Sequence, residues 1–193
     1  MRRSVRDGVL CAGAGLVVGA VIWNVTTAAY GDPPEAPEPT AVACPRDGVR
    51  VTPGPVDAAL GLRAMNLVLE NCGTRTYRVK GYPGLRLLDR DQQTVTGISV
   101  IHGSGGIATV TGFDEPPKTV TLAPGETASA GLVWRNTTTG FDGAAYVPYL
   151  TVEAKPGGFP GLVAPDGGLD LGTTGKLGVG PWRTTTADDG GTR

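Results

Sequence analysis

The sequence predicts an all-β, antiparallel β-sandwich that is preceded by one N-terminal hydrophobic helix. Apolar and polar residues alternate with a period of two through most of the chain after residue 43, as they do in half-buried strands. Gly and Pro residues recur between these alternating runs, and their totals of 31 and 16 are too high for a helical bundle. One long apolar run without charge lies before residue 32 and accounts for the single helix.

Residues 1–30 are expected to be a cleaved signal peptide or a single transmembrane anchor. Three arginines within the first six residues precede a run from Gly8 to Gly31 that contains no charged side chain. This arrangement is typical of export and keeps the positive end in the cytoplasm. The run is long enough to span a bilayer, while Thr27-Ala28-Ala29 offers a signal-peptidase site. Both alternatives place the remaining chain outside the cytoplasm, either anchored to the cell membrane or secreted.

Residues 31–42 are expected to form a Pro/Glu-rich spacer. The stretch from Asp32 to Thr40 contains four prolines, three acidic residues and no large apolar residue. Such a composition cannot form a core and favours an extended, stiff conformation. A ragged mature N-terminus is the alternative interpretation. Residues 43–185 are then expected to form the sandwich domain, and residues 186–193 a disordered tail.

The charge balance excludes several classes of partner and site. The chain has 17 basic and 18 acidic residues, and 14 of each remain after the first two segments are set aside. A neutral exported domain carries no electrostatic footprint for nucleic acid. One His and three Cys do not provide the ligand set of a zinc site. We therefore expect no metal site and no cofactor.

Cys44 and Cys72 are expected to form a disulfide. The third cysteine falls in the apolar N-terminal run, which leaves an even pair in an oxidising compartment. Strands are predicted over Gly48–Thr52 and Leu62–Glu70, with the turn-rich stretch Pro53–Gly61 between them. If these strands form an antiparallel hairpin, the two cysteines face each other at its open end. Two free thiols are the alternative.

The same alternation places the other strands of the predicted sandwich. They cover residues 77–80, 85–87, 95–100 with a bulge near Gly97, 120–122, 128–134 and 150–152, followed by a last pair over residues 169–171 and 177–179. Two Gly-rich or Pro-rich stretches, His102–Pro117 and Lys155–Gly168, are predicted to be surface loops.

Two stretches of the domain carry a family resemblance. The first, from Asn71 to Leu85, contains the turn sequence Gly-Tyr-Pro-Gly; the second, from Val120 to Ala130, contains Leu-Ala-Pro-Gly. In this order, and together with the early Cys44, they resemble the actinobacterial exported domain of unknown function 4232. The resemblance covers the chain from Cys44 to the last strand near Trp182.

The resemblance implies an immunoglobulin-like sandwich that lies outside the cell, on a lipoprotein, a signal peptide or an anchor. It implies no activity and no site residues. The family often places its second cysteine where Tyr77 stands in this chain, whereas here the second cysteine is Cys72.

The sequence contains no recognisable catalytic set. His102 is the only histidine, and Ser104 lies close to it, but the pattern G-x-S-x-G of a nucleophile elbow is absent. Trp134 is expected to point into the core, because it is in phase with Leu132.

Aromatic side chains provide the only candidate binding face. Tyr149 is out of phase with Leu150 and is expected to point outward, where it would lie with Trp182. We therefore predict a non-enzymatic interaction or structural module at the cell envelope. Its expected partners are an envelope protein or glycan, and the membrane itself if the N-terminal segment is not cleaved. The alternative is a small-ligand binder or a hydrolase with a site built from loops.

Overall fold

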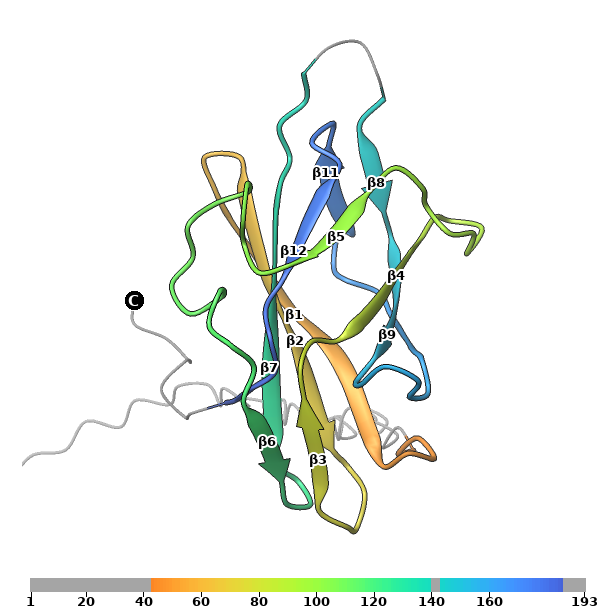
Figure 1. Ribbon diagram of the computed structural model, residues 1–193. Coiled ribbons are helices and arrows are strands. Elements are labelled where there is room, and N and C mark those ends of the chain that lie inside the picture. Colours follow the sequence, from red (N-terminus) through yellow and green to blue (C-terminus); the bar gives the residue numbers. More distant parts are fainter. Residues whose placement is uncertain (1–42, 140–142, 186–193) are drawn as a thin grey trace, which may run out of the picture. The chain divides into compact units, whose positions relative to one another are not determined.

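The computed structural model describes residues 43–139 and 143–185, which form thirteen strands and no helix (Figure 1). The all-β prediction is therefore confirmed. The predicted N-terminal helix, the spacer and the tail lie outside the described residues. Within the part of the chain that is described, there is no helix with the length and apolar character needed to cross a membrane.

One large sheet contains six strands. Its order is β1-β2-β7-β12-β5, and β13 pairs with the early part of β7. The bounds are β1 (Val49–Ala59), β2 (Leu62–Asn71), β7 (Thr127–Arg135), β12 (Lys176–Val179), β5 (Ser99–His102) and β13 (Arg183–Thr184). Every pairing in this sheet is antiparallel except that between β12 and β5, which is parallel. This one pair departs from the antiparallel prediction.

Three smaller sheets lie against the large one. They are β10 (Gly161–Val163), β9 (Tyr149–Glu153) and β4 (Gly84–Leu88); β11 (Leu169–Gly172) and β8 (Ala145–Val147); and β3 (Tyr77–Lys80) and β6 (Thr119–Leu122). A single cluster of buried apolar side chains draws on all four sheets, as expected for two layers around one core. Trp134 is fully buried in this cluster, which confirms its predicted inward orientation.

β1 and β2 form the predicted hairpin, and Cys44 and Cys72 are joined by a disulfide with a Cα–Cα distance of 5.6 Å. The predicted loop Pro53–Gly61 is wrong, because β1 continues to Ala59 and only Leu60 and Gly61 make the turn. Prolines are tolerated here since β1 is an edge strand, whose outer side has no ladder partner that an amide hydrogen would have to bind.

The later part of the chain differs more from the prediction. The two strands predicted as a last pair belong to different sheets, because β11 pairs with β8 while β12 inserts between β7 and β5. The predicted loop Lys155–Gly168 contains strand β10. The predicted strand over residues 95–100 begins only at Ser99. The partners of β5, β11 and β12 are not neighbours in chain order, and local alternation carries no information about them.

A charged residue ties the large sheet to β11. The Asp170 carboxylate accepts hydrogen bonds from Arg63 Nη2 at 2.9 Å, Trp134 Nε1 at 3.0 Å and Asn136 Nδ2 at 3.0 Å. This arrangement gives the indole N–H of the buried Trp134 a hydrogen-bond acceptor. Without it, a polar group would be left unpaired in the core.

Candidate functional site

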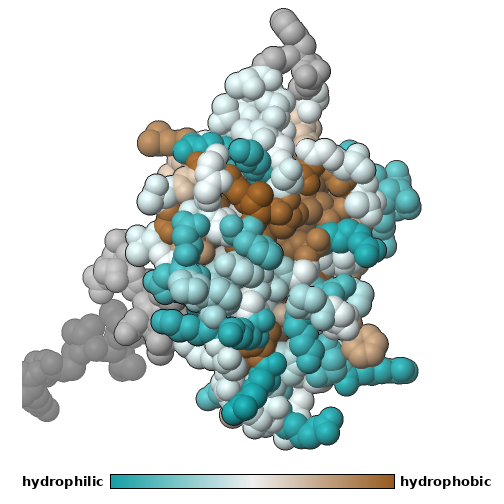
Figure 2. Space-filling view, viewed as in Figure 1, coloured by the Kyte–Doolittle hydropathy of each residue, from teal (hydrophilic) through white to brown (hydrophobic). Residues whose placement is uncertain are grey.

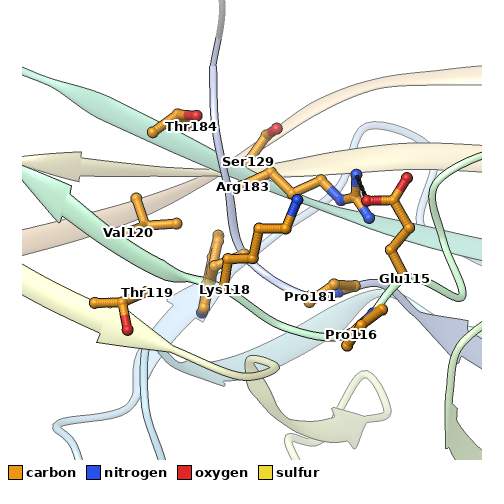
Figure 3. A pocket seen from close by; sticks show the side chains of 10 residues that line it. Glu115, Pro116, Lys118, Thr119, Val120, Ser129, Pro181, Arg183 and Thr184 are labelled. Carbon is orange, nitrogen blue, oxygen red and sulfur yellow. Dashed lines mark ion pairs between the residues drawn. The ribbon is translucent and has the colours of Figure 1, made fainter.

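A groove between β6 and β13 is the candidate site, and it has a volume of about 420 Å³ (Figure 3). Three parts of the chain form its walls: the stretch leading into β6 with the start of that strand, the early part of β7, and the residues that follow β12. Its lining residues are Glu115, Pro116, Lys118, Thr119, Val120, Ser129, Pro181, Trp182, Arg183 and Thr184.

Phe113 brings one wall of the groove onto the large sheet. A Cβ atom at position 131 would lie 2.4 Å from Phe113 Cε2, so the ring occupies the space that Gly131 leaves open on β7. Phe113 thus holds the segment 103–118 against the sheet, at a point two residues before Glu115. This contact explains how a segment without strands presents charged side chains at a fixed place.

Arg183 closes one end of the groove. Its Nη2 donates a hydrogen bond to the Gly112 carbonyl, and its Nη1 lies 3.3 Å from Glu115 Oε2, the ion pair that is dashed in Figure 3. Both side chains are about half exposed, at 40% and 53%. An exposed pair of this kind is weak, so a ligand that carries its own carboxylate can compete with Glu115 for Arg183.

Lys118 supplies a second positive charge. Its side chain extends along the groove with the ammonium group toward Arg183 (Figure 3). None of the ion pairs between described residues includes Lys118. With Glu115 opposite Arg183, the groove carries a net charge of one positive unit, and hydroxyls of Ser129 and Thr184 add hydrogen-bonding groups. Such a groove favours a ligand with an acidic group.

Two strand edges border the groove. β6 pairs only with β3, and β13 pairs only with β7, within the described residues. Each strand therefore has one side without a ladder partner. Backbone N–H and C=O groups along such an edge can pair with an extended peptide.

A second hollow of about 470 Å³ continues past Arg183, over Met65 of β2 and Gly131. It shares Glu115, Ser129, Pro181 and Arg183 with the first groove. The Arg183–Glu115 ion pair therefore stands between two hollows, and an extended ligand could lie along both.

The prediction that Trp182 forms an exposed binding face is wrong. Its side chain is 1% exposed, and its Nε1 donates a hydrogen bond of 2.7 Å to the Ala154 carbonyl. The ring fills the core beneath the groove, where it forms the floor. The Gly-Pro residues before Trp182 interrupt the alternation after β12, so local phase could not show the direction of the side chain.

Three other described aromatic residues, Tyr146, Tyr149 and Phe159, do not complete the predicted face. Tyr149 begins β9 and is half-buried, so its predicted outward position is met only in part. Tyr146 is 43% exposed, but Arg90 covers its ring at 5.5 Å. Phe159 is 66% exposed and lines a separate hollow beside β1. With Trp182 in the core, these side chains do not form one aromatic surface.

His102 and Ser104 serve different contacts. The His102 ring stacks on Tyr82, with 3.9 Å between ring centroids. The Ser104 hydroxyl donates to Asp114 Oδ2 at 2.8 Å, and its backbone amide donates to Oδ1 at 2.8 Å. These two hydrogen bonds lower the pKa of Asp114 below its ordinary value. Among the described residues, no hydrogen bond joins His102 to Ser104.

Acidic residues of the domain show no arrangement suited to a metal ion. No group of three or more His, Cys, Asp or Glu side chains comes together among residues 43–139 and 143–185. The Asp89 side chain accepts hydrogen bonds from the backbone amides of Asp91 at 2.9 Å and Gln93 at 2.8 Å. It therefore stabilises a turn.

The groove residues were not found from the sequence. Lys118 and Arg183 lie far apart in the chain. Lys118 directly follows Pro117 and Arg183 lies two residues after Pro181, both in stretches without alternation. No local pattern distinguishes such residues from ordinary solvated charges. The packing of Phe113 over β7 and the contacts of Arg183 with Gly112 and Glu115 bring their two segments together.

The comparisons with known proteins give a family and no function. A family model described as "Domain of unknown function (DUF4232)" matches residues 44–183. No curated protein and no solved structure matches the chain. The match covers nearly all of the described domain, from the first disulfide cysteine to Arg183 in the groove. The chain therefore belongs to the DUF4232 family, as its two turn-containing stretches suggested.

Proposed function

We propose that the chain is a non-enzymatic interaction module of the cell envelope that holds an extended segment of an envelope protein in the Arg183–Lys118 groove. The observation that carries this proposal is the position of the groove between two strands that each have an unpaired edge. A polypeptide fits such a site better than a glycan does, because its backbone can pair with β6 or β13.

The charges of the groove indicate what the bound segment contains. Lys118 has no ion-pair partner among the described residues, and Arg183 is held only by a half-exposed ion pair and a backbone contact. An Asp or Glu side chain of the partner placed between them would meet both cations. We therefore expect a segment with at least one acidic residue among small or apolar ones that fit beside Pro116 and Pro181.

Two features support a place outside the cytoplasm. The uncharged run from Gly8 to Gly31 follows three arginines, as in exported chains. The Cys44–Cys72 disulfide is the kind of bond that persists in an oxidising compartment. The spacer of residues 31–42 would hold the domain away from the membrane or wall.

The test is retention of envelope material by the full-length tagged chain in mild detergent. The native chain is expected to retain a discrete protein, and Lys118→Glu is expected to weaken retention on the order of tenfold, since it places a negative charge against an acidic ligand. Arg86→Glu is the matched control, because Arg86 is an exposed residue of β4 outside the groove.

The outcomes separate the partner classes. Retention of a glycan without protein would show that the partner is a sugar chain and not a polypeptide. Equal retention by the native chain and Lys118→Glu would rule out the groove as the site. Retention of nothing by either chain would count against an interaction module.

A small-ligand binder or a hydrolase with a loop-built site is the second candidate. The groove volume of about 420 Å³ falls in the range of small-molecule pockets. Thermal-shift screening with small carboxylic acids would favour a binder if a shift appears in the native chain and is lost in Lys118→Glu. An activity that is lost in His102→Ala would favour the hydrolase.

A further inference from the structure

Among the described residues, β5 is an edge strand with backbone groups left to pair. It stands at the end of the large sheet and contacts β12 on one side. The amides of Ser99 and Gly103 donate to Gly175 and Val179 carbonyls, both at 2.8 Å. In a parallel strand, the backbone N–H and C=O groups of successive residues point alternately to the two sides of the strand. The backbone groups of Ile101 therefore also point toward β12. Val100 and His102 then direct their N–H and C=O groups away from the sheet.

The two edges of the large sheet are protected unequally. At the other edge, β1 contains Pro53 and Pro55, a register shift between Pro53 and Val56, and the exposed Asp57. Prolines, bulges and charges are the features that prevent strand-to-strand association. β5 has the sequence Ser-Val-Ile-His, with no proline, no bulge and no Asp, Glu, Lys or Arg.

Apolar surface accompanies the unprotected edge. Figure 2 shows a brown band in the upper middle of the molecule, where β5 lies in the same view of Figure 1. Val100 is 37% exposed, and the neighbouring Val95 and Ile98 are only partly buried. A partner strand along β5 would cover part of this band.

We propose that β5 pairs antiparallel with β5 of a second copy of this chain, and that the two large sheets become continuous across a two-fold axis. The register follows from the directions of the backbone groups. Val100 faces His102 of the second copy and His102 faces its Val100, so that four backbone hydrogen bonds form. Ile101 lies directly opposite Ile101 of the second copy at a non-hydrogen-bonded position.

A second copy fits this edge because the edge is self-complementary. Its two outward-facing residues lie symmetrically about Ile101, as an isologous interface requires. The edge itself carries no fixed charge, and the basic and acidic residues outside the first two segments balance at 14 each. Two copies therefore approach without net repulsion.

The register gives a specific cross-linking test in the full-length chain with Cys11→Ser as the background. In the proposed pair, the Cα atoms at position 101 lie about 4.5 Å apart, within disulfide range. Ile101→Cys is therefore expected to give a covalent dimer on mild oxidation in detergent or in membranes. Val100→Cys is the matched control, because its two copies are offset by two residues and lie about 8 Å apart, beyond disulfide range.

A second measurement guards against a folding defect in Ile101→Cys. Val100→Lys places a charge on the edge without removing a bond to β12, and sedimentation should show a monomer where the native chain is a dimer. Native thermal stability in Val100→Lys confirms that the fold is retained. A native chain that stays monomeric at all concentrations, or equal cross-linking by Val100→Cys and Ile101→Cys, would overturn the proposed pairing.

Discussion

The two halves of the large sheet are built in different ways. In the first half, β1 and β2 follow each other in sequence, and the Cys44–Cys72 disulfide closes their open end. In the second half, the four-residue strands β12 and β5 come from distant parts of the chain and pair in parallel. The first half has a protected edge, whereas the second half has an exposed one.

This difference teaches where the stability of each half comes from. The hairpin is local, so a single turn and one covalent bond set its register. Buried Asn71 adds to it, because its Nδ2 donates to Arg75 and Leu122 carbonyls, each at 2.9 Å. The second half has no such local support. Its position depends on close packing of β12 against β7, β5 and the segment 103–118.

Removal of the disulfide should have the largest effect, and it should act on the first half. The bond spans 28 residues, and Cys44→Ser/Cys72→Ser is expected to lower the free energy of unfolding by about 3–4 kcal/mol. Urea denaturation measures the loss, and hydrogen exchange should rise first in β1 and β2. Cys11→Ser is the control for removal of a thiol. An unchanged urea midpoint in the double variant would contradict the role assigned to the bond.

Addition of a methyl group at Gly178 should break the second half selectively. A Cβ atom there would lie 2.6 Å from the Gly103 carbonyl oxygen and 2.8 Å from Val133 Cγ1. Gly178→Ala is therefore expected to lower the free energy of unfolding by about 1–3 kcal/mol through overpacking. Hydrogen exchange should rise in β12 and β5 while β1 and β2 stay protected.

A strand glycine with open space provides the control for this variant. The nearest atom to a Cβ at Gly161 is the Val152 carbonyl oxygen at 3.9 Å, so Gly161→Ala should change stability little. Equal loss in the two variants would show that close packing at Gly178 is not what positions β12.

The smallest effect is expected at Asp170, which joins the sheet to β11. Burial raises the pKa of Asp170, but hydrogen bonds from Arg63, Trp134 and Asn136 and the charge of Arg63 outweigh it, so the pKa is lowered. A lowered pKa means that the ionised group stabilises the fold above its unfolded pKa, and that this stabilisation is lost as pH falls through the folded pKa.

Asp170→Asn tests this sign. The side chain is 44% exposed, so solvent screens the interaction, and we expect a loss of about 1 kcal/mol near neutral pH. Melting temperatures of the native chain and the variant should converge as the pH is lowered below about 4. A difference that persists unchanged in acid would show that hydrogen-bond geometry, and not the charge, is responsible.

Residues with local constraints were predictable from the sequence. The hairpin, the disulfide and the inward Trp134 all follow from alternation or from spacing between neighbouring strands. Trp182 was not predictable, because a Gly-Pro bend precedes it and removes the phase that would give its direction. Lys118 and Arg183 were not predictable either. A charged residue in a groove differs from one on an open surface only by the segments of the chain that lie across from it.

By itself, the sequence determined that the domain is made of strands, that its first two strands form a closed hairpin, and to which family it belongs. These properties depend on side-chain period and on residues near one another in the chain. The tertiary structure alone decided that β12 lies between β7 and β5 in a parallel pair, and that Phe113 packs over Gly131 to form the groove. Such contacts join segments that are far apart in the chain. Their energy comes from shape complementarity between packed side chains, which cannot be predicted from a local sequence pattern.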